Sequence, residues 1–197
     1  MTASELSALI GSRICHDLIS PLGAIGNGVE LLTMSGIAST PEIALIAESV
    51  ENANARIRFF RVAFGAASLG VEIGQSEVQS ILRETYKGGR IRVDWRAKGA
   101  LGRADVKLAF LLLQCLENTL PWGGQIVIRR TGNDWRLEAR GEKLKVDSRL
   151  WGILTDPSST AEVAAADVHF ALVHDAARGA GRRVLNFLSE TRVALSF

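Results

Sequence analysis

The spacing of apolar residues near the N-terminus constrains the fold of this chain more than any other feature of its sequence. At about 100° per residue, one side of a single helix collects apolar residues with the alternating four- and three-residue steps of a heptad: Ile14, Leu18, Leu22, Ile25, Val29 and Leu32. The opposite side collects polar or small residues: Ser12, His16, Ser20, Gly23, Asn27 and Glu30. We therefore expect His16 on the solvent-facing side, where another protein can reach it.

Pro21 is expected to distort this helix beside His16. A proline inside a helix removes one backbone hydrogen bond and presses on the carbonyl group four residues earlier, at a cost of about 3 kcal/mol. That carbonyl belongs to Asp17, so a distortion there exposes the imidazole to a partner. The alternative is an exposed histidine in a helix that happens to contain a proline, and the helical wheel alone favours neither interpretation.

The string His-Asp-Leu-x-x-Pro-Leu-x-Ala-Ile at residues 16–25 resembles the H-box of two-component histidine kinases, whose histidine carries a phosphoryl group. The resemblance implies that His16 accepts and donates a phosphoryl group through a ring nitrogen. It also implies that Asp17 orients and polarises the ring, which makes His16 and Asp17 the predicted catalytic residues. Small or polar residues in the same stripe leave room for a helix of a receiver domain. They form the predicted partner-binding surface: Ser12, Ser20, Gly23 and Asn27.

Residues 1–72 are predicted to form a helical hairpin that serves dimerisation and phosphotransfer. The first helix runs from Ser4 to about Met34, where Ser35-Gly36 ends it. Ser or Thr before Pro41 begins a second helix, which runs to about Leu69. Two long helices with a short connection cannot bury an apolar stripe alone, whereas two copies can form a four-helix bundle. We therefore expect a homodimer.

Residues 73–197 are predicted to form a two-layer α/β sandwich. Helical periodicity over 77–86, 104–120 and 164–178 is interleaved with strand patterns over 91–95, 125–130, 135–140, 183–188 and 192–197. Helices packed on a mostly antiparallel sheet explain this order, so the whole chain is assigned to the α+β class. The order resembles the ATP-binding domain of histidine kinases, which has the Bergerat-type fold.

The resemblance to that domain does not extend to its nucleotide motifs. Asn118 falls at the position of the family's magnesium-binding asparagine, although a helix cap or surface amide is the better interpretation. Residues 139–145 lack the aspartate that reads adenine in the family. Residues 167–170 carry an acid and two bulky rings where the family needs glycines whose N–H groups approach phosphates. We therefore expect a degenerate domain that binds no ATP, no cofactor and no metal of its own.

Composition and charge narrow the class of protein further. A net charge of +2 gives no electrostatic reason for a nucleic-acid partner. The two cysteines, Cys15 and Cys115, lie in apolar helical patterns, which is typical of reduced thiols in a cytosol. His169 and His174 lack neighbours at metal spacing, so structural roles are expected. Without a signal-peptide pattern or a membrane-spanning apolar run, we expect a cytoplasmic protein with no membrane partner.

An H-box hairpin joined to a kinase-like domain without nucleotide motifs resembles the ChpT-type histidine phosphotransferases of bacterial phosphorelays. That family is dimeric and moves a phosphoryl group between aspartates on the receiver domains of a hybrid kinase and of response regulators. The resemblance implies transfer through His16, with magnesium supplied by the receiver. Three alternatives stay open: an active histidine kinase fragment, a phosphatase or inhibitor that docks on a regulator, and a dimeric scaffold in which His16 is incidental.

Overall fold

A computed structural model of the protein describes residues 3–35, 40–68, 70–156, 159 and 162–197. The chain divides into two compact units, and each is described by itself. Unit 1 is Met1–Ala66 with Ser80–Thr85, and unit 2 is Ala67–Gln79 with Tyr86–Phe197. Among the described residues, no helix is both long enough and apolar enough to span a bilayer.

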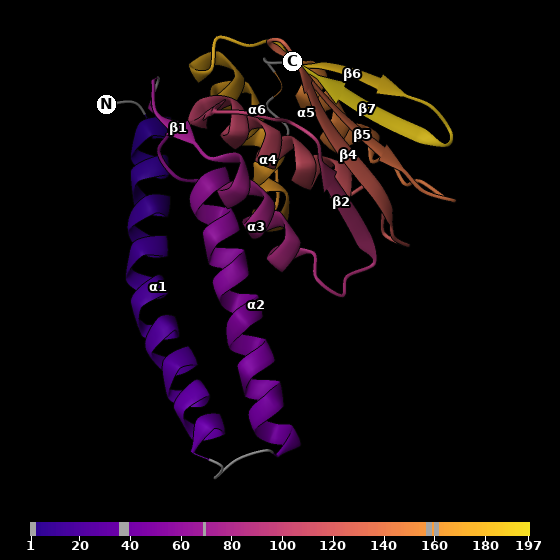
Figure 1. Ribbon diagram of the computed structural model, residues 1–197. Helices are drawn as coiled ribbons and strands as arrows, with labels where there is room; N and C mark the ends of the chain where they lie inside the picture. Colours follow the sequence, from indigo (N-terminus) through magenta and orange to yellow (C-terminus); the bar gives the residue numbers. More distant parts are fainter. Residues whose placement is uncertain (1–2, 36–39, 69, 157–158, 160–161) are drawn as a thin grey trace. The chain divides into compact units, whose positions relative to one another are not determined.

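Unit 1 contains the predicted helical hairpin. Helix α1 spans Ala3–Met34 and α2 spans Pro41–Ala63 (Figure 1). Thr40 precedes α2 with an extended backbone, and Pro41 is the first helical residue, where its missing N–H has no helical partner to lose. The predicted stop at Gly36 and the residue Ser39 lie outside the described residues.

Helix α2 ends earlier than the predicted end near Leu69, which is itself outside the described residues. Its last helical residue is Ala63, and the N–H of Phe64 donates to the Phe60 carbonyl oxygen at 2.8 Å. At Gly65 the backbone passes so close to Arg61 that a Cβ atom would lie 2.2 Å from the Arg61 carbonyl oxygen. Because only glycine permits this approach, backbone packing overrides the apolar periodicity that predicts a longer helix.

Unit 2 is built on a five-stranded sheet with the strand order β2-β4-β5-β7-β6 (Figure 1). The strands are β2 Ile91–Trp95, β4 Gly124–Thr131, β5 Asp134–Arg140, β6 Leu185–Leu188 and β7 Arg192–Ser196. Strands β2 and β4 are parallel and the other neighbours are antiparallel, which confirms the mostly antiparallel sheet. The pair β1 (Glu72–Ile73) and β3 (Leu101–Gly102) was not predicted, because two residues are too few to show a strand period.

Helices cover one face of this sheet. Helix α3 (Gln75–Thr85) is shared between the two units, while α4 (Arg103–Glu117), α5 (Ser148–Thr155) and α6 (Val168–Gly179) pack in unit 2 (Figure 1). The Trp95 ring of β2 meets the Phe110 ring of α4 edge to face, with centroids 6.1 Å apart. The α4 residues predicted to face inward are fully buried: Leu108, Leu111, Leu112, Cys115 and Leu116. The α+β class and the sandwich are thus confirmed.

One helix of unit 2 was not predicted, and several element boundaries differ from the prediction. Helix α5 lies in a stretch predicted to be irregular, and it begins because the Asp147 side chain accepts hydrogen bonds from the N–H groups of Arg149 and Leu150. Helix α4 ends at Glu117 rather than Leu120, because a turn follows in which the Thr119 hydroxyl donates to the Leu116 carbonyl. A 3₁₀ turn at Ala165–Asp167 replaces the first turn predicted for α6.

Candidate functional site

His16 lies on the exposed side of α1, as the helical wheel predicts. Its side chain is 83% exposed and that of Asp17 is 49% exposed. Helix α1 is helical through Pro21, so the proline does not end it. Because proline has no N–H, the carbonyl group of Asp17 lacks its usual helical donor. The His16 imidazole thus lies on a continuous helix, and its exposure leaves it accessible to a partner protein.

Both carboxylate oxygens of Asp17 are engaged by neighbours on α1. Arg13 Nε donates to Oδ2 at 2.7 Å, and His16 Nδ1 lies 3.0 Å from Oδ1. The hydrogen bond from His16, followed by that from Arg13, lowers the pKa of Asp17 below its ordinary value. Asp17 is consequently held as a carboxylate at neutral pH, in contact with the histidine ring.

The ionised state of Asp17 assigns the tautomer of His16. A carboxylate can only accept hydrogen bonds, so Nδ1 of His16 must carry the proton and donate it to Oδ1. In the neutral ring the lone pair available for bond formation then resides on Nε2. No described residue hydrogen-bonds to Nε2. The geometry thus presents one nucleophilic nitrogen to solvent and fixes the other by a charge-assisted hydrogen bond.

Arg13 is a further residue of this site that the H-box pattern did not predict. Its side chain forms an ion pair with Asp17 across one helical turn, the (i, i+4) spacing at which opposite charges meet on a helix. The four-residue spacing between Arg13 and Asp17, with a histidine next to the acid, is the sequence signal that points to Arg13. Arg13 holds the carboxylate in place rather than contacting the ring.

The predicted partner-binding residues differ in their surroundings. Ser20 and Asn27 are exposed, and Gly23 lies in open space, with no atom within 4 Å of the position a Cβ would occupy. Ser12 is half-buried, and its Oγ accepts a hydrogen bond from the Ala66 N–H at 3.0 Å. Beside His16, the surface at Ser20, Gly23 and Asn27 therefore consists of small side chains with open space at Gly23. The Ser12 hydroxyl, in contrast, is bonded to the Ala66 main-chain N–H.

Cys15, the neighbour of His16, does not compete with it as a nucleophile. The thiol is buried, and burial raises the pKa of Cys15 above its ordinary value, with the positive charge of Arg61 opposing the shift. A protonated thiol is a poor nucleophile. The accessible reactive atom in this stretch is thus on His16.

The apolar stripe of α1 is largely unburied within a single chain. Val29 is buried and Leu22 is half-buried. Four other members of the predicted heptad are between 42% and 54% exposed: Ile14, Leu18, Ile25 and Leu32. Exposed apolar patches of this kind mark contact surfaces.

In unit 2, Asn118 and the two other histidines have structural contacts. Asn118 caps the C-terminus of α4, and its Nδ2 donates to the Asp167 carboxylate at 3.1 Å. His169 is buried, and burial lowers its pKa to about 4 while Asp167 opposes the shift. His174 Nε2 contacts the Ile153 carbonyl oxygen. No cluster of three or more potential metal-binding side chains occurs in the described part of the chain.

A helical hairpin with an exposed histidine, followed by an α/β sandwich, is the architecture of a histidine phosphotransfer protein. Residues 75–191 match the family model of the histidine phosphotransferase C-terminal domain. The protein phosphotransferase ChpT of Brucella abortus (strain 2308) is 40% identical over 156 residues, which are 76% of this chain and 74% of that protein. A solved bacterial phosphotransferase aligns with a TM-score of 0.72 at 30% identity, covering 100% of this chain and 97% of its own.

The chain belongs to the family of ChpT-type histidine phosphotransferases. It is a phosphorelay enzyme that transfers phosphoryl groups, as its sequence predicts.

Proposed function

We propose that the Nε2 atom of His16 carries the phosphoryl group between aspartates of receiver domains. The observation that carries this proposal is the pairing of an exposed His16 with Asp17 through Nδ1, which leaves Nε2 as the nucleophile. His16 is also the one described histidine that is exposed, since His169 is buried and His174 is half-buried.

The transfer has two reversible steps. In the first, the Nε2 lone pair attacks the phosphorus of a receiver aspartyl phosphate in line, so an N–P bond forms while the P–O bond to the aspartate breaks. The ring gains a positive charge that the Asp17 carboxylate stabilises through the Nδ1 proton. In the second step, an aspartate of another receiver attacks the phosphorus and His16 returns to its neutral form. Magnesium bound by the receiver neutralises the phosphoryl oxygens in both steps, so the chain needs no cofactor of its own.

The partners of this reaction are receiver domains of a hybrid histidine kinase and of response regulators. Such domains need a surface on which an approaching helix can lie beside His16. Open space at Gly23 and the small exposed side chains of Ser20 and Asn27 support this docking surface. Ser12 contributes by anchoring the main chain at Ala66 at the same end of the hairpin.

We further propose that the hairpin pairs with a second copy to form a four-helix bundle. The half-exposed apolar heptad of α1 supports this arrangement, because its burial provides the driving force for association. Two free cysteines, both buried, accord with the reduced thiols of a cytoplasmic protein.

Transfer is proposed to proceed without ATP. The hydrogen bond between Asn118 and Asp167 supports this, because it places an anionic carboxylate beside the amide that would otherwise face magnesium. A carboxylate there repels phosphates rather than attracting them. Calorimetry with millimolar Mg-ATP should therefore show no saturable binding. Saturable binding would indicate an active kinase instead.

The proposal is tested by incubating the protein with a receiver domain carrying radiolabelled phosphate. Wild-type protein should accept label, His16→Ala should accept none, and His169→Ala and His174→Ala should accept it at the wild-type level. Label on the His16→Ala variant would contradict the assignment. Wild-type protein that only releases inorganic phosphate from the receiver would instead indicate a phosphatase.

A further inference from the structure

The sheet face opposite the helices carries a concentration of arginine side chains. Successive side chains of a strand point to opposite faces, and in β5 Trp135, Leu137 and Ala139 are buried against the helices. Arg136, Glu138 and Arg140 therefore point outward. The same alternation, carried across the pairing of neighbouring strands, puts further arginines on the outer face: Arg92 of β2, Arg129 of β4 and Arg192 of β7.

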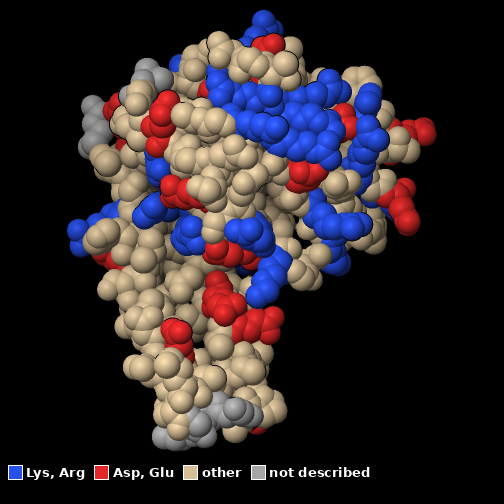
Figure 2. All heavy atoms as spheres, viewed as in Figure 1, with Lys and Arg blue, Asp and Glu red and all other residues tan. Residues whose placement is uncertain are grey.

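The register places these arginines in two rows across the sheet. Arg140 pairs with Arg192 on one side and with Gln125 on the other, and Gln125 pairs with Arg92. In the second row Arg136 pairs with Arg129. Neighbouring strands are about 4.8 Å apart, so the guanidinium groups can contact one ligand together. Figure 2 shows Lys and Arg side chains gathered in a broad patch on the face of the molecule in view.

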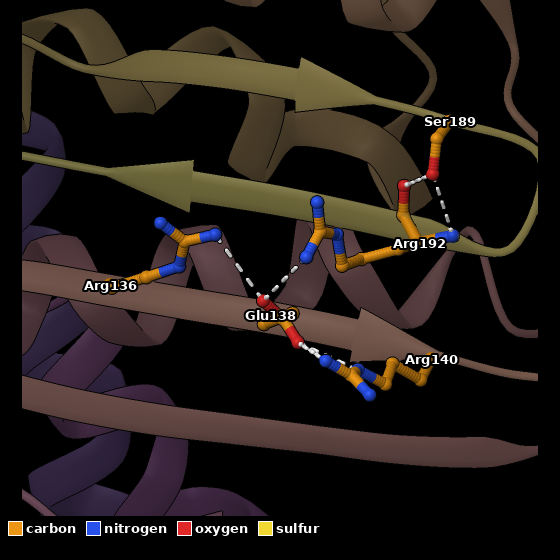
Figure 3. Close-up of polar contacts among 5 residues, drawn as sticks. All are labelled: Arg136, Glu138, Arg140, Ser189 and Arg192. Atoms are coloured by element: carbon orange, nitrogen blue, oxygen red, sulfur yellow. Dashed lines mark hydrogen bonds and ion pairs between the residues drawn. The ribbon is translucent and has the colours of Figure 1, made fainter.

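Glu138 organises the centre of this face. Its side chain is only 9% exposed, and three arginines approach it: Arg140 at 2.6 Å, Arg136 at 3.4 Å and Arg192 at 3.8 Å (Figure 3). One carboxylate cannot neutralise three guanidinium groups, so the cluster keeps an excess of positive charge. The carboxylate instead holds the arginines in fixed positions, which reduces the entropy that a ligand must remove on binding.

Arg92 and Arg129 add positive charge to the face. Neither has an ion-pair partner among the described residues. The neighbouring acid, Asp94, is already paired with Arg96 at 2.6 Å. Asp134, the first residue of β5, also points to this face, so the five arginines outnumber its acids Asp94, Asp134 and Glu138.

An apolar margin borders the arginines on the edge strand β6. Leu185 and Phe187 pair with Ser196 and Ala194 of β7 and so point to the same outer face, where they are 58% and 50% exposed. The guanidinium group of Arg192 lies 5.0 Å from the centre of the Phe187 ring. A partner that meets both parts of the surface must present negative charge next to apolar side chains.

We propose that this arginine face, formed by Arg92, Arg129, Arg136, Arg140 and Arg192 with Leu185 and Phe187, binds an acidic protein segment that contains apolar residues. Guanidinium groups match carboxylates in a two-bond geometry, and the apolar margin gives such a segment a second kind of contact. A single-stranded nucleic acid would need exposed rings for base stacking. Among the described outward-facing strand residues, Phe187 is a single aromatic ring, half-exposed beside Arg192, whereas a bound strand stacks successive bases on several rings.

The arginine face lies within unit 2 and includes no residue of the His16 site. It therefore extends the proposed function to a second kind of contact, by which the enzyme can be held by a partner whether or not His16 is phosphorylated. His16→Ala should leave this binding unchanged, which separates the two proposals experimentally.

The test measures fluorescence anisotropy of a labelled glutamate-rich peptide with interspersed leucines, titrated with the full chain. An all-glutamate peptide and a single-stranded DNA oligonucleotide of equal length are the comparison probes. The leucine-containing peptide should bind most tightly, and added salt should weaken the binding of this peptide. The double substitution Arg136→Ala/Arg192→Ala should weaken it by about tenfold or more. Arg178→Ala, on α6 in the helical layer, is the matched control and should have no effect.

Three results would overturn the inference. The first is the absence of saturable peptide binding. The second is binding that Arg136→Ala/Arg192→Ala leaves unchanged while its thermal unfolding matches that of the wild type. The third is tighter binding of the oligonucleotide that the same substitutions abolish, which would assign the face to nucleic acid. Leu185→Ser keeps every charge and should cost a smaller factor, of about threefold, which checks the apolar margin separately.

Discussion

At the scale of single residues, the chemistry depends on how Asp17 divides its two carboxylate oxygens. One oxygen meets Arg13 and the other meets Nδ1 of His16. Arg13 therefore fixes the carboxylate, and the carboxylate fixes the ring and its tautomer. Substitution of Asp17 should therefore affect phosphoryl transfer more than substitution of Arg13.

Asp17→Asn should slow phosphoryl transfer to His16 roughly tenfold, because the amide replaces a charge-assisted hydrogen bond with a neutral one. Transfer should not stop, since the aspartyl phosphate donor is already activated. Arg13→Ala should have a smaller effect, of about two- to threefold, because it acts only through Asp17. Single-turnover rates with a phosphorylated receiver measure both. A larger loss for Arg13→Ala than for Asp17→Asn would show that Arg13 contacts the phosphoryl group directly.

His169 predicts a pH dependence of stability. Burial lowers its pKa in the folded protein to about 4, whereas an ordinary histidine has a pKa of about 6.5. As the pH falls through this window, the unfolded chain binds a proton that the folded chain does not, so the free energy of unfolding decreases. The protein should be about 2 kcal/mol less stable at pH 5 than at pH 7 through this residue.

Urea unfolding at the two pH values checks this difference. In His169→Leu the difference between pH 7 and pH 5 should shrink by about the same amount, because the titrating group is gone. An equal pH dependence in the variant and the wild type would mean that other groups cause it. His174→Leu, which removes a half-buried histidine bonded to the Ile153 carbonyl, is the comparison.

At the scale of elements, helix α1 has to remain a continuous helix and also leave space beside His16 for a docking partner. Gly23 leaves this space. No atom lies within 4 Å of the position that a Cβ would occupy, so packing does not require a glycine there. Gly26 differs, because a Cβ there would be in ordinary van der Waals contact, 3.5 Å from the Val50 side chain of α2. A side chain at position 26 would therefore contact α2, whereas one at position 23 would meet no described atom of the chain near its Cβ.

Gly23→Arg should leave the thermal unfolding temperature unchanged or raise it, because arginine favours helix more than glycine does. Phosphoryl acceptance from a receiver should fall by about tenfold or more, since the long side chain fills the docking surface. Gly28→Arg is the matched control, because Gly28 also lies in open space on α1 but on another side of the helix from His16. Unchanged transfer in Gly23→Arg would place the docking surface elsewhere.

The elements themselves were largely predictable from sequence. The heptad spacing and the Thr40-Pro41 entry signal predict both helices of the hairpin, and the strand pattern at residues 91–95 matches β2 residue for residue. The end of α2 was not predictable, because the close approach of Gly65 to the Arg61 carbonyl is a property of the folded backbone. Helix α5 was missed although its cap, Asp147, is visible in the sequence.

The candidate site was predicted less completely. His16 and Asp17 follow from a local string, so their contact could be anticipated. The engagement of Ser12 with Ala66 could not, because it joins residues far apart in sequence. The arginine face was equally hidden, since its members come from five strands and meet only once the register is known.

At the scale of the whole molecule, the apolar stripe of α1 links the fold to its proposed assembly. Ile25 is half-exposed in a single chain and would be buried in a four-helix bundle. Sedimentation at micromolar concentration should show a wild-type dimer. Ile25→Asp should sediment as a monomer, because burying an unpaired charge costs several kcal/mol.

Asn27→Asp is the control for this experiment, because it adds the same charge on the polar side of the helix and should remain dimeric. A wild-type protein that sediments as a folded monomer would contradict the bundle.

The position of the phosphoryl group on the phosphorylated protein tests the phosphotransfer mechanism most directly. Nuclear magnetic resonance correlating phosphorus with histidine ring protons distinguishes the two nitrogens, because Nε2 neighbours both carbon-bound ring protons and Nδ1 neighbours only one. The predicted result is a single phosphohistidine at His16 with phosphorus coupled to both protons. Phosphorus coupled to one proton, or a phosphohistidine at His169 or His174, would contradict the role assigned to Asp17 and Nε2 of His16.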